Sequence, residues 1–256
     1  MSRCFAFAGL AAALTVPHAA AARSYGEALV ESVARRHPDI AGIAVTAADS
    51  QGKAIALAWG GSTRGASTVT LRNGLGDIVG TLAITFRHGH GDADAVAREL
   101  AHRIYTVGVL SEPDPVAPDA RRSRLGQALV ERTIDREPGL VTLALHVALP
   151  GRDNRIIASN FGRIGKAADK DDAHVIADSA TLREVTNAGR RLAVELPLLD
   201  RTGKTIGALS TSYLLVAPRD KAAAYAQAVA LRDSLARRIA SLESLVEPED
   251  IAPAPR

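Results

Sequence analysis

Residues 154–216 (NRIIASNFGRIGKAADKDDAHVIADSATLREVTNAGRRLAVELPLLDRTGKTIGALSTSYLLV) contain the pattern that decides the predicted fold. An apolar strand ending at Ser159 and Asn160 is followed by a loop rich in Arg, Lys and Asp and by a short polar helix. A long hairpin then turns at residues 200–203, where Gly203 can adopt the positive φ that tight turns require. We expect a binding site at the polar connection between the two pairs of strands.

An imperfect internal repeat extends outward from this stretch. Residues 28–31 (ALVE) recur as residues 128–131, and both copies continue into a basic bend that contains a proline. Residues 68–86 align with residues 195–213, and the identical pairs include Leu71/Leu198, Gly76/Gly203 and Gly80/Gly207. Several matches in one order are typical of a duplication. Each copy is predicted to contain a helix, two strands, a connection, two more strands and a helix.

The periodicity of apolar residues predicts the elements of each copy. Residues 27–36 and 125–136 have helical spacing, whereas residues 40–47 and 140–149 are rich in the β-branched residues typical of strands. The last helix is predicted to run through residues 219–245. Its apolar stripe suits core packing, with an oligomer contact as the alternative. The two copies differ in the connection, which is short at residues 60–67 and longer by about two dozen residues in the second copy.

This order of elements resembles the PAS-like fold of extracellular Cache sensor domains. The likeness depends on the two hairpins, on the Gly-Lys-Thr-Ile-Gly turn at residues 203–207 and on the position of the polar connection. It implies an α+β fold of two tandem PAS/Cache-like units, each an antiparallel sheet flanked by N- and C-terminal helices. It further implies a pocket between sheet and connection, where members of that family hold amino acids, carboxylates or purines. Cache domains usually adjoin membrane helices and a signalling output, so a sensory role here would need a separate membrane-receptor or signalling partner.

The predicted organisation divides the chain into five segments. Residues 1–22 carry Arg3, an apolar run and a small-residue A-x-A site, as in a secretory signal peptide, which predicts an exported, periplasmic protein. Residues 23–110 form a first, shortened unit, 111–120 a Pro-rich linker, 121–246 a second, complete unit and 247–256 a disordered tail. No stretch after residue 22 is apolar enough to predict an integral membrane segment. A packing platform or a homodimer surface is the expected role of the first unit.

Composition and missing motifs exclude several functions. The net charge of +3 has no basic stripe, so no nucleic-acid partner is expected. The single cysteine, Cys4, precedes the predicted cleavage site, and the mature chain then has no thiol nucleophile or disulfide. No nucleophile elbow or zinc-protease motif is present, and Ser159 has no identifiable base, which argues against an enzyme. His88 and His90 lack a third ligand, so we expect a turn there and no metal or cofactor.

The connection supplies the first candidate ligand-binding residues. Ser159 and Asn160 offer a hydroxyl and an amide, and two glycines let the backbone approach a ligand. Arg163 could bind a carboxylate or phosphate through its planar guanidinium, with Lys166 adding a second cation. These charges predict an anionic or zwitterionic small molecule. A solvated loop remains the alternative for the Arg–Lys pair.

The remaining candidates lie on the helix and the last strand. Asp169 and Asp172 suit an N-cap and its first turn, while Asp172 could instead meet a ligand amine or pair with the arginine of the loop. His174 is expected either to contact the ligand or to lie on an exposed helix surface. His146 is expected in the core, and Tyr213 is the last residue expected to line the pocket. Two functions stay open: a small-molecule-binding or sensory protein, and a non-catalytic interaction or scaffold protein whose loop is surface.

Overall fold

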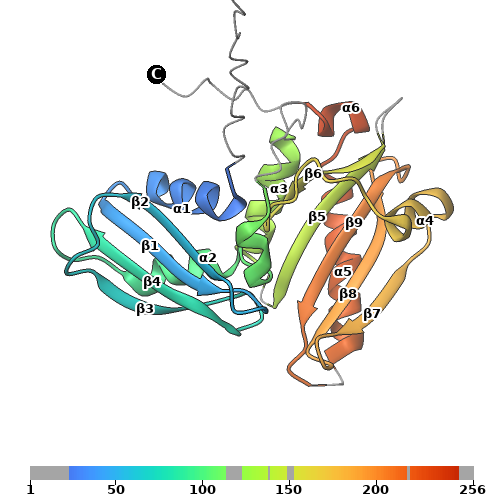
Figure 1. Cartoon of the computed structure of the whole chain (residues 1–256). Helices are drawn as coiled ribbons and strands as arrows, with labels where there is room; N and C mark the ends of the chain where they lie inside the picture. Colours follow the sequence, from blue (N-terminus) through green and yellow to red (C-terminus); the bar gives the residue numbers. More distant parts are fainter. Residues whose placement is uncertain (1–22, 114–122, 138, 149–152, 218–219, 248–256) are drawn as a thin grey trace, which may run out of the picture.

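A computed structural model describes residues 23–113, 123–137, 139–148, 153–217 and 220–247 of the chain. The predicted signal peptide, most of the predicted linker and the tail beyond residue 247 lie outside this part. Within it, helices pack against two antiparallel sheets, which confirms the predicted α+β class (Figure 1). We refer to residues 23–113 as the N-terminal half and to residues 123–247 as the C-terminal half.

The N-terminal half is a four-stranded sheet with two helices. Its elements are α1 (Tyr25–Arg36), β1 (Ile40–Ala48), β2 (Ala54–Gly60), β3 (Ser67–Arg72), β4 (Ile78–Phe86), α2 (Ala93–Ala101) and the short 3₁₀ helix η1 (Val107–Ser111). The C-terminal half has the same plan with an added helix and strand. Its elements are α3 (Arg124–Ile134), β5 (Leu140–Ala148), β6 (Asn154–Ser159), α4 (Lys170–Asp178), β7 (Leu182–Thr186), β8 (Arg191–Leu199), β9 (Thr205–Leu214), α5 (Asp220–Ala236) and α6 (Leu242–Leu245).

The two sheets have corresponding strand orders. The first is ordered β2-β1-β4-β3 and the second β6-β5-β9-β8-β7, with all neighbouring strands antiparallel. The predicted hairpins therefore occupy equivalent positions, and β7 is an addition at one edge. The connection between the second and third strands is short in the first sheet, from Gly60 to Ser67, and carries α4 and β7 in the second. The sequence did not predict β7 as a strand of its own.

The aligned turns have the same hydrogen bonds in both halves. Asn73 Oδ1 accepts from the backbone N–H groups of Leu75 (3.0 Å) and Asp77 (2.9 Å). Its counterpart, Asp200 Oδ1, accepts from those of Thr202 (2.8 Å) and Lys204 (3.1 Å). The following glycines of both turns have φ near +80°, at +80° and +84°. The side chain before each turn therefore organises the hairpin locally.

The aligned glycines Gly80 and Gly207 have the same structural role. A Cβ atom at Gly80 would lie 2.1 Å from the carbonyl oxygen of Thr46, and one at Gly207 would lie 2.0 Å from that of His146. Both residues lie on an inner strand of their sheet and face the first strand of their half. Only a residue without a side chain allows this close approach of two strands.

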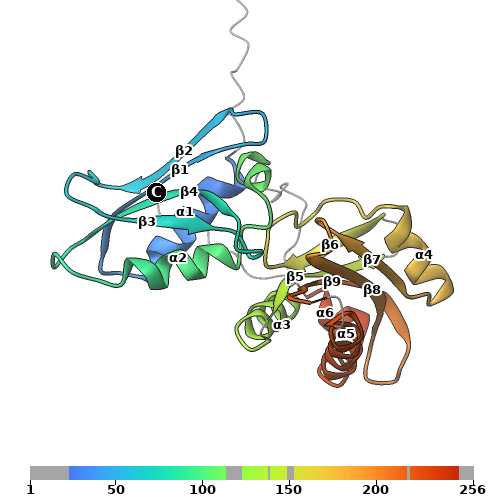
Figure 2. The ribbon, with the colours of Figure 1, turned by 90° about the horizontal axis from the view of Figure 1, so that it is seen from below.

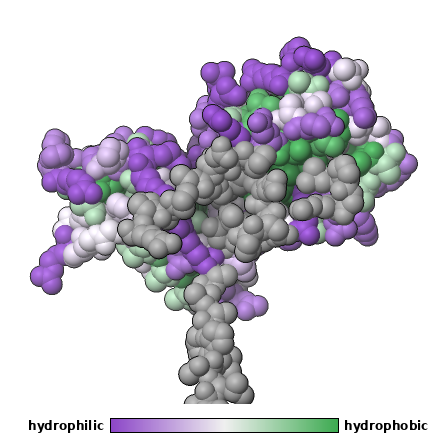
Figure 3. All heavy atoms as spheres, turned by 90° about the horizontal axis from the view of Figure 1, so that it is seen from above, coloured by the Kyte–Doolittle hydropathy of each residue, from purple (hydrophilic) through white to green (hydrophobic). Residues whose placement is uncertain are grey.

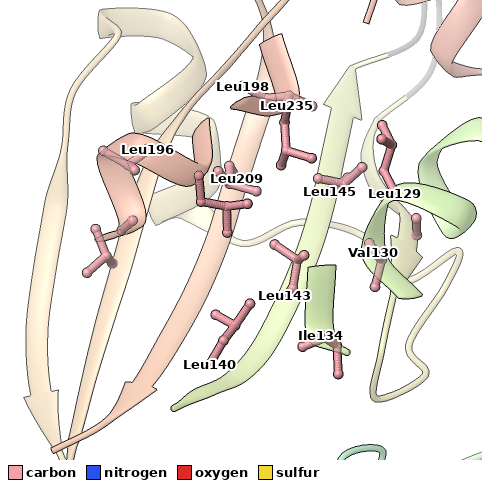
Figure 4. Packing of buried hydrophobic residues seen from close by; sticks show 14 of the residues in the cluster. Leu129, Val130, Ile134, Leu140, Leu143, Leu145, Leu196, Leu198, Leu209 and Leu235 are labelled. Carbon is pink, nitrogen blue, oxygen red and sulfur yellow. The ribbon is translucent and has the colours of Figure 1, made fainter. Parts of the chain in front are cut away.

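One face of the five-stranded sheet packs against α3 and α5 (Figures 1 and 2). Alternate residues of β5, β8 and β9 point to this side, as expected for the two-residue period of a strand. Leucines from these strands meet Leu129 and Val130 of α3 and Leu235 of α5 in a continuous core (Figure 4). The helix predicted over residues 219–245 is wrong in one respect: α5 ends at Ala236, and Ser241 caps a separate helix, α6. Between them, fully buried Ile239 joins the core and accepts a hydrogen bond from Arg201 N–H.

The opposite face of each sheet is covered differently. In the N-terminal half, short side chains such as Thr46, Ala56, Thr70 and Thr81 are exposed there. In the C-terminal half, α4 lies over β8 and β9, and Ile164 of the loop before it packs on Ala144 of β5 and Ile156 of β6. Since the longer connection supplies both of these segments, the difference in length predicted from the sequence becomes a difference between an open and a covered sheet face.

Candidate functional site

Asn160 joins the two halves of the chain. Its side-chain Oδ1 accepts from Leu143 N–H (2.8 Å), while Nδ2 donates to the carbonyls of Val141 (3.0 Å) and, across the junction, His102 (2.6 Å). These bonds use the acceptor and both donors of the amide. Beside it, buried Ser159 donates to the carbonyl of Gly162. The polar atoms of both predicted residues thus serve the loop and the junction.

Arg163 also contacts the N-terminal half. Its Nε and Nη2 donate to Oε2 (3.1 Å) and Oε1 (2.7 Å) of Glu112, a bidentate pair. The backbone of Arg163 has φ of 64°, which turns the loop sharply before Ile164 enters a small apolar cluster under it. Lys166, the second predicted cation, is exposed. In the structure, Arg163 is therefore held in an ion pair, whereas Lys166 lies at the surface.

Asp172 anchors α4 on the sheet. Its side chain is almost fully buried; Oδ2 lies 3.1 Å from His146 Nδ1, and Oδ1 accepts a 3.2 Å hydrogen bond from Ser210 Oγ. Despite burial, these two partners and the backbone of Asp169 hold the pKa of Asp172 below its ordinary value. Asp169 is the N-cap of α4, as predicted, and forms a capping box with Asp172. His146 of β5 is the partner that the sequence did not assign to Asp172.

Glu195 adds a second acid beneath α4. It lies on β8 directly opposite Ser210 of β9, and its Oε2 is buried with no hydrogen-bond partner among the described residues. Burial, together with the negative charges of Asp172 and Asp169, raises the pKa of Glu195 to about 7. The polar layer under α4 therefore contains one carboxylate that is stabilised as an anion and another that favours its protonated form.

The last two predicted residues lie elsewhere. His174 is exposed on α4 and its Nδ1 lies 2.8 Å from Oδ2 of Asp178, one turn further on. Tyr213 is buried in the helix-side core, on the face of β9 away from Ser210, and burial raises the pKa of its hydroxyl. The structure thus brings Asp169 and Asp172 together under α4 and Ser159 and Asn160 at the junction, but it does not gather all eight predicted residues.

A cleft of about 520 Å³ lies at the junction of the two halves. One wall is α1 with Arg23 just before it, and the other includes α3 and the loop after β6. Ser159 and Asn160 are on its surface, next to Tyr25, whose hydroxyl donates to the carbonyl of Arg103 (3.0 Å) and contacts that of Asn160 (3.4 Å). Figure 3 views the molecule from above, the side of α1 and α3, and shows hydrophilic residues around the rim of both halves and a hydrophobic patch on the C-terminal half.

The cleft holds more cations than its acids neutralise. Arg23 and Arg35 both contact the carboxylate of Glu31. Arg103 lies 3.9 Å from Glu131, at the limit of an ion pair. Because a single carboxylate serves two guanidinium groups on the α1 wall, that wall carries a net positive charge.

Sequence reasoning missed most of the residues of this cleft. Arg23, Arg35 and Arg103 are far apart in the sequence and carry no motif. A usable signal did exist in the repeated ALVE, which places Glu31 and Glu131 at matching positions of α1 and α3, and both residues line the cleft. Only the structure shows that α1 and α3 line the same cleft.

Comparisons with known proteins show no family for this chain. No family model matches it, and no curated protein matches its sequence. One solved structure, described as a transcriptional regulator of the IclR family from Rhodococcus sp., is 14% identical and covers 65% of this chain and 74% of its own, with a TM-score of 0.29. Among the described residues, no helix has the length and apolar character needed to cross a membrane, and no three His, Cys, Asp or Glu side chains are grouped as metal ligands.

Proposed function

We propose that this chain is an exported, non-catalytic binding protein that holds a small anionic or zwitterionic molecule in the junction cleft. The observation that carries the proposal is the uncompensated positive charge of the α1 wall, where Arg23 and Arg35 share Glu31. A carboxylate or phosphate group that enters the cleft completes the neutralisation of these guanidinium groups through charge-assisted hydrogen bonds.

The opposite wall supplies neutral and acidic groups. Gln127 of α3 donates through Nε2 to the carbonyl of Ser159 (3.1 Å) and contacts Oε1 of Glu131 (3.3 Å). A ligand of mixed charge would therefore place its anionic end toward α1 and its cationic end toward Glu131. Both halves contribute to such a site, so binding depends on the junction that Asn160 and Arg163 maintain.

The wider setting is part of the proposal. The corresponding strand orders and the matched turns support two tandem PAS/Cache-like units, the second extended by α4 and β7. The composition of residues 1–22 supports export to the periplasm. A sensory role would then require a separate receptor or signalling partner that reads the bound state of the cleft.

Calorimetric titration of the purified chain with small carboxylates, amino acids and inorganic phosphate tests the proposal. We expect at least one of them to bind, with affinity reduced about tenfold or more in Arg35→Gln, since a charge-assisted contact is lost. Arg98→Gln is the matched control, because Arg98 is an equally exposed helix arginine whose partner is Asp92, and it does not line the cleft. Absence of binding at millimolar concentrations, or equal effects of both variants, would contradict the proposal.

A scaffold is the second candidate function, and the junction contacts favour it. Arg163 and Arg190 each bind an acid of the N-terminal half, at 2.7 Å from Glu112 and Asp77 respectively. These bonds suit a protein whose two sheets present fixed surfaces to a partner. The titration separates the two functions, because a scaffold without a ligand gives no heat with any of the small molecules.

A further inference from the structure

A second groove, of about 530 Å³, lies where the turn between β3 and β4 meets the turn between β7 and β8. The N-terminal half contributes Ile78 and residues 105–107, and the C-terminal half contributes Thr186 and Arg191. This groove shares no lining residue with the junction cleft. It is therefore a separate place on the molecule.

Arg191 is a half-buried cation without an acid. Its guanidinium lies 4.6 Å from the ring centre of Tyr105, and no carboxylate forms an ion pair with it among the described residues. The Nε atom is buried and donates no hydrogen bond to any described group. Burial also lowers the pKa of this guanidinium. An uncompensated charge in such a position is costly for a folded protein unless an anion binds to it.

The groups next to Arg191 do not supply the acid that its guanidinium lacks. Arg190, one residue earlier, binds Asp77 Oδ1 (2.7 Å) and the carbonyl of Leu75 (2.6 Å), so the acid of the groove is already neutralised. Thr186 lies directly opposite Arg191 in the β7–β8 pair, and its Oγ1 is also buried without a partner. Two donors without acceptors thus lie side by side on adjacent strands.

The groove also has an apolar part, beside the polar lining residues Asn73, Thr106 and Asn187. Ile78 is 65% exposed, an unusual degree of exposure for a large apolar residue, and it lies in the groove with Val107 and Tyr105. We propose that this groove binds a monocarboxylate with an apolar body, whose carboxylate pairs with the half-buried guanidinium of Arg191 and whose body covers Ile78 and Val107. Charge complementarity selects the carboxylate, and burial of Ile78 favours the apolar body over a small hydrophilic anion.

Titration of the full chain with sodium hexanoate tests this proposal, with acetate and hexan-1-ol as probes that lack the apolar body and the charge, respectively. Hexanoate is expected to bind more tightly than either. Arg191→Gln should weaken hexanoate about tenfold or more, and Arg191→Lys, which keeps the charge without the planar fork, should give an intermediate loss. Ile78→Ser changes an exposed side chain, so it should weaken hexanoate binding without an expected loss of folding.

Arg183→Gln is the matched control, because the Arg183 guanidinium also lies over a tyrosine ring, 4.7 Å from the centre of Tyr225, on the neighbouring strand and outside the groove. It should leave the hexanoate affinity unchanged, as should Arg35→Gln in the junction cleft. Loss of hexanoate binding in Arg35→Gln but not in Arg191→Gln would assign the ligand to the cleft and overturn the groove site. Equal binding of hexan-1-ol and hexanoate, or no binding of hexanoate at millimolar concentrations, would overturn it as well.

Discussion

The replacement Glu195→Gln should remove a pH dependence of stability that the wild-type chain has near neutrality. Burial beneath α4 and the acids of its first turn raise the pKa of Glu195 from 4.5 to about 7, so the folded state holds this proton more tightly than the unfolded state. The resulting stabilisation is fully present below the unfolded pKa and is lost as the pH rises through about 7. Glutamine keeps the size of the side chain and cannot ionise.

The size of the effect follows from the shift. A difference of one pKa unit corresponds to about 1.4 kcal/mol, which sets an upper limit of about 3 kcal/mol for Glu195. Solvent reaches part of this side chain, so we expect about 1–2 kcal/mol. Relative to Glu195→Gln, the wild-type free energy of unfolding should therefore fall by about that amount between about pH 5 and pH 8. His146, Asp172, Asp169, Asp171 and Glu184 are the same in both proteins, which differ only at position 195.

Urea unfolding followed by far-UV circular dichroism, at a series of pH values, measures this difference. Trp59, the single tryptophan, lies on β2 of the N-terminal half, so its fluorescence reports separately on the half that lacks Glu195. Glu184→Gln is the control, because Glu184 is an exposed acid of the neighbouring strand β7. A wild-type minus Glu195→Gln difference that stays constant with pH would refute the reasoning, as would an equal effect of Glu184→Gln.

Four further substitutions have expected outcomes that unfolding experiments can check. Asp172→Asn should lower the free energy of unfolding by about 3 kcal/mol, because His146 loses its buried carboxylate partner. Since the pKa of Asp172 is lowered in the folded state, this difference from the wild type should shrink as the pH falls below about 4, and a difference that persists in acid would contradict the prediction. Asn160→Ala should lower the free energy of unfolding by about 2–4 kcal/mol, because three hydrogen bonds are lost, and should increase amide hydrogen exchange at the junction. Unchanged exchange there would show that Asn160 does not hold the two halves together. Gly207→Ala and Gly80→Ala should each lower the free energy of unfolding by about 2 kcal/mol or more, because the new Cβ atom clashes with a carbonyl oxygen of the neighbouring strand. An unchanged free energy of unfolding would mean that the two strands can move apart without cost.

The sequence predicted those parts of the fold that depend on local interactions. Apolar periodicity located α1, α3 and the first strand of each sheet, and the Gly-containing turns located the hairpins. The matched residues Gly80 and Gly207 were visible in the alignment because each position admits only glycine. The prediction of an unbroken last helix was wrong, because the end of α5 depends on Ile239 entering the core, a contact that helical periodicity does not express.

Local sequence patterns were enough to predict an α+β protein with matched hairpins and a polar connection in its second half. Only the tertiary structure decided what the polar residues contact. Asn160 and Arg163 were predicted to line the pocket, yet their partners His102 and Glu112 come from the other half of the chain. The cleft, the pairing of Asp172 with His146 and the unneutralised Arg191 likewise depend on contacts between distant segments. Such contacts follow from how two sheets and their helices pack, and no short stretch of sequence encodes them.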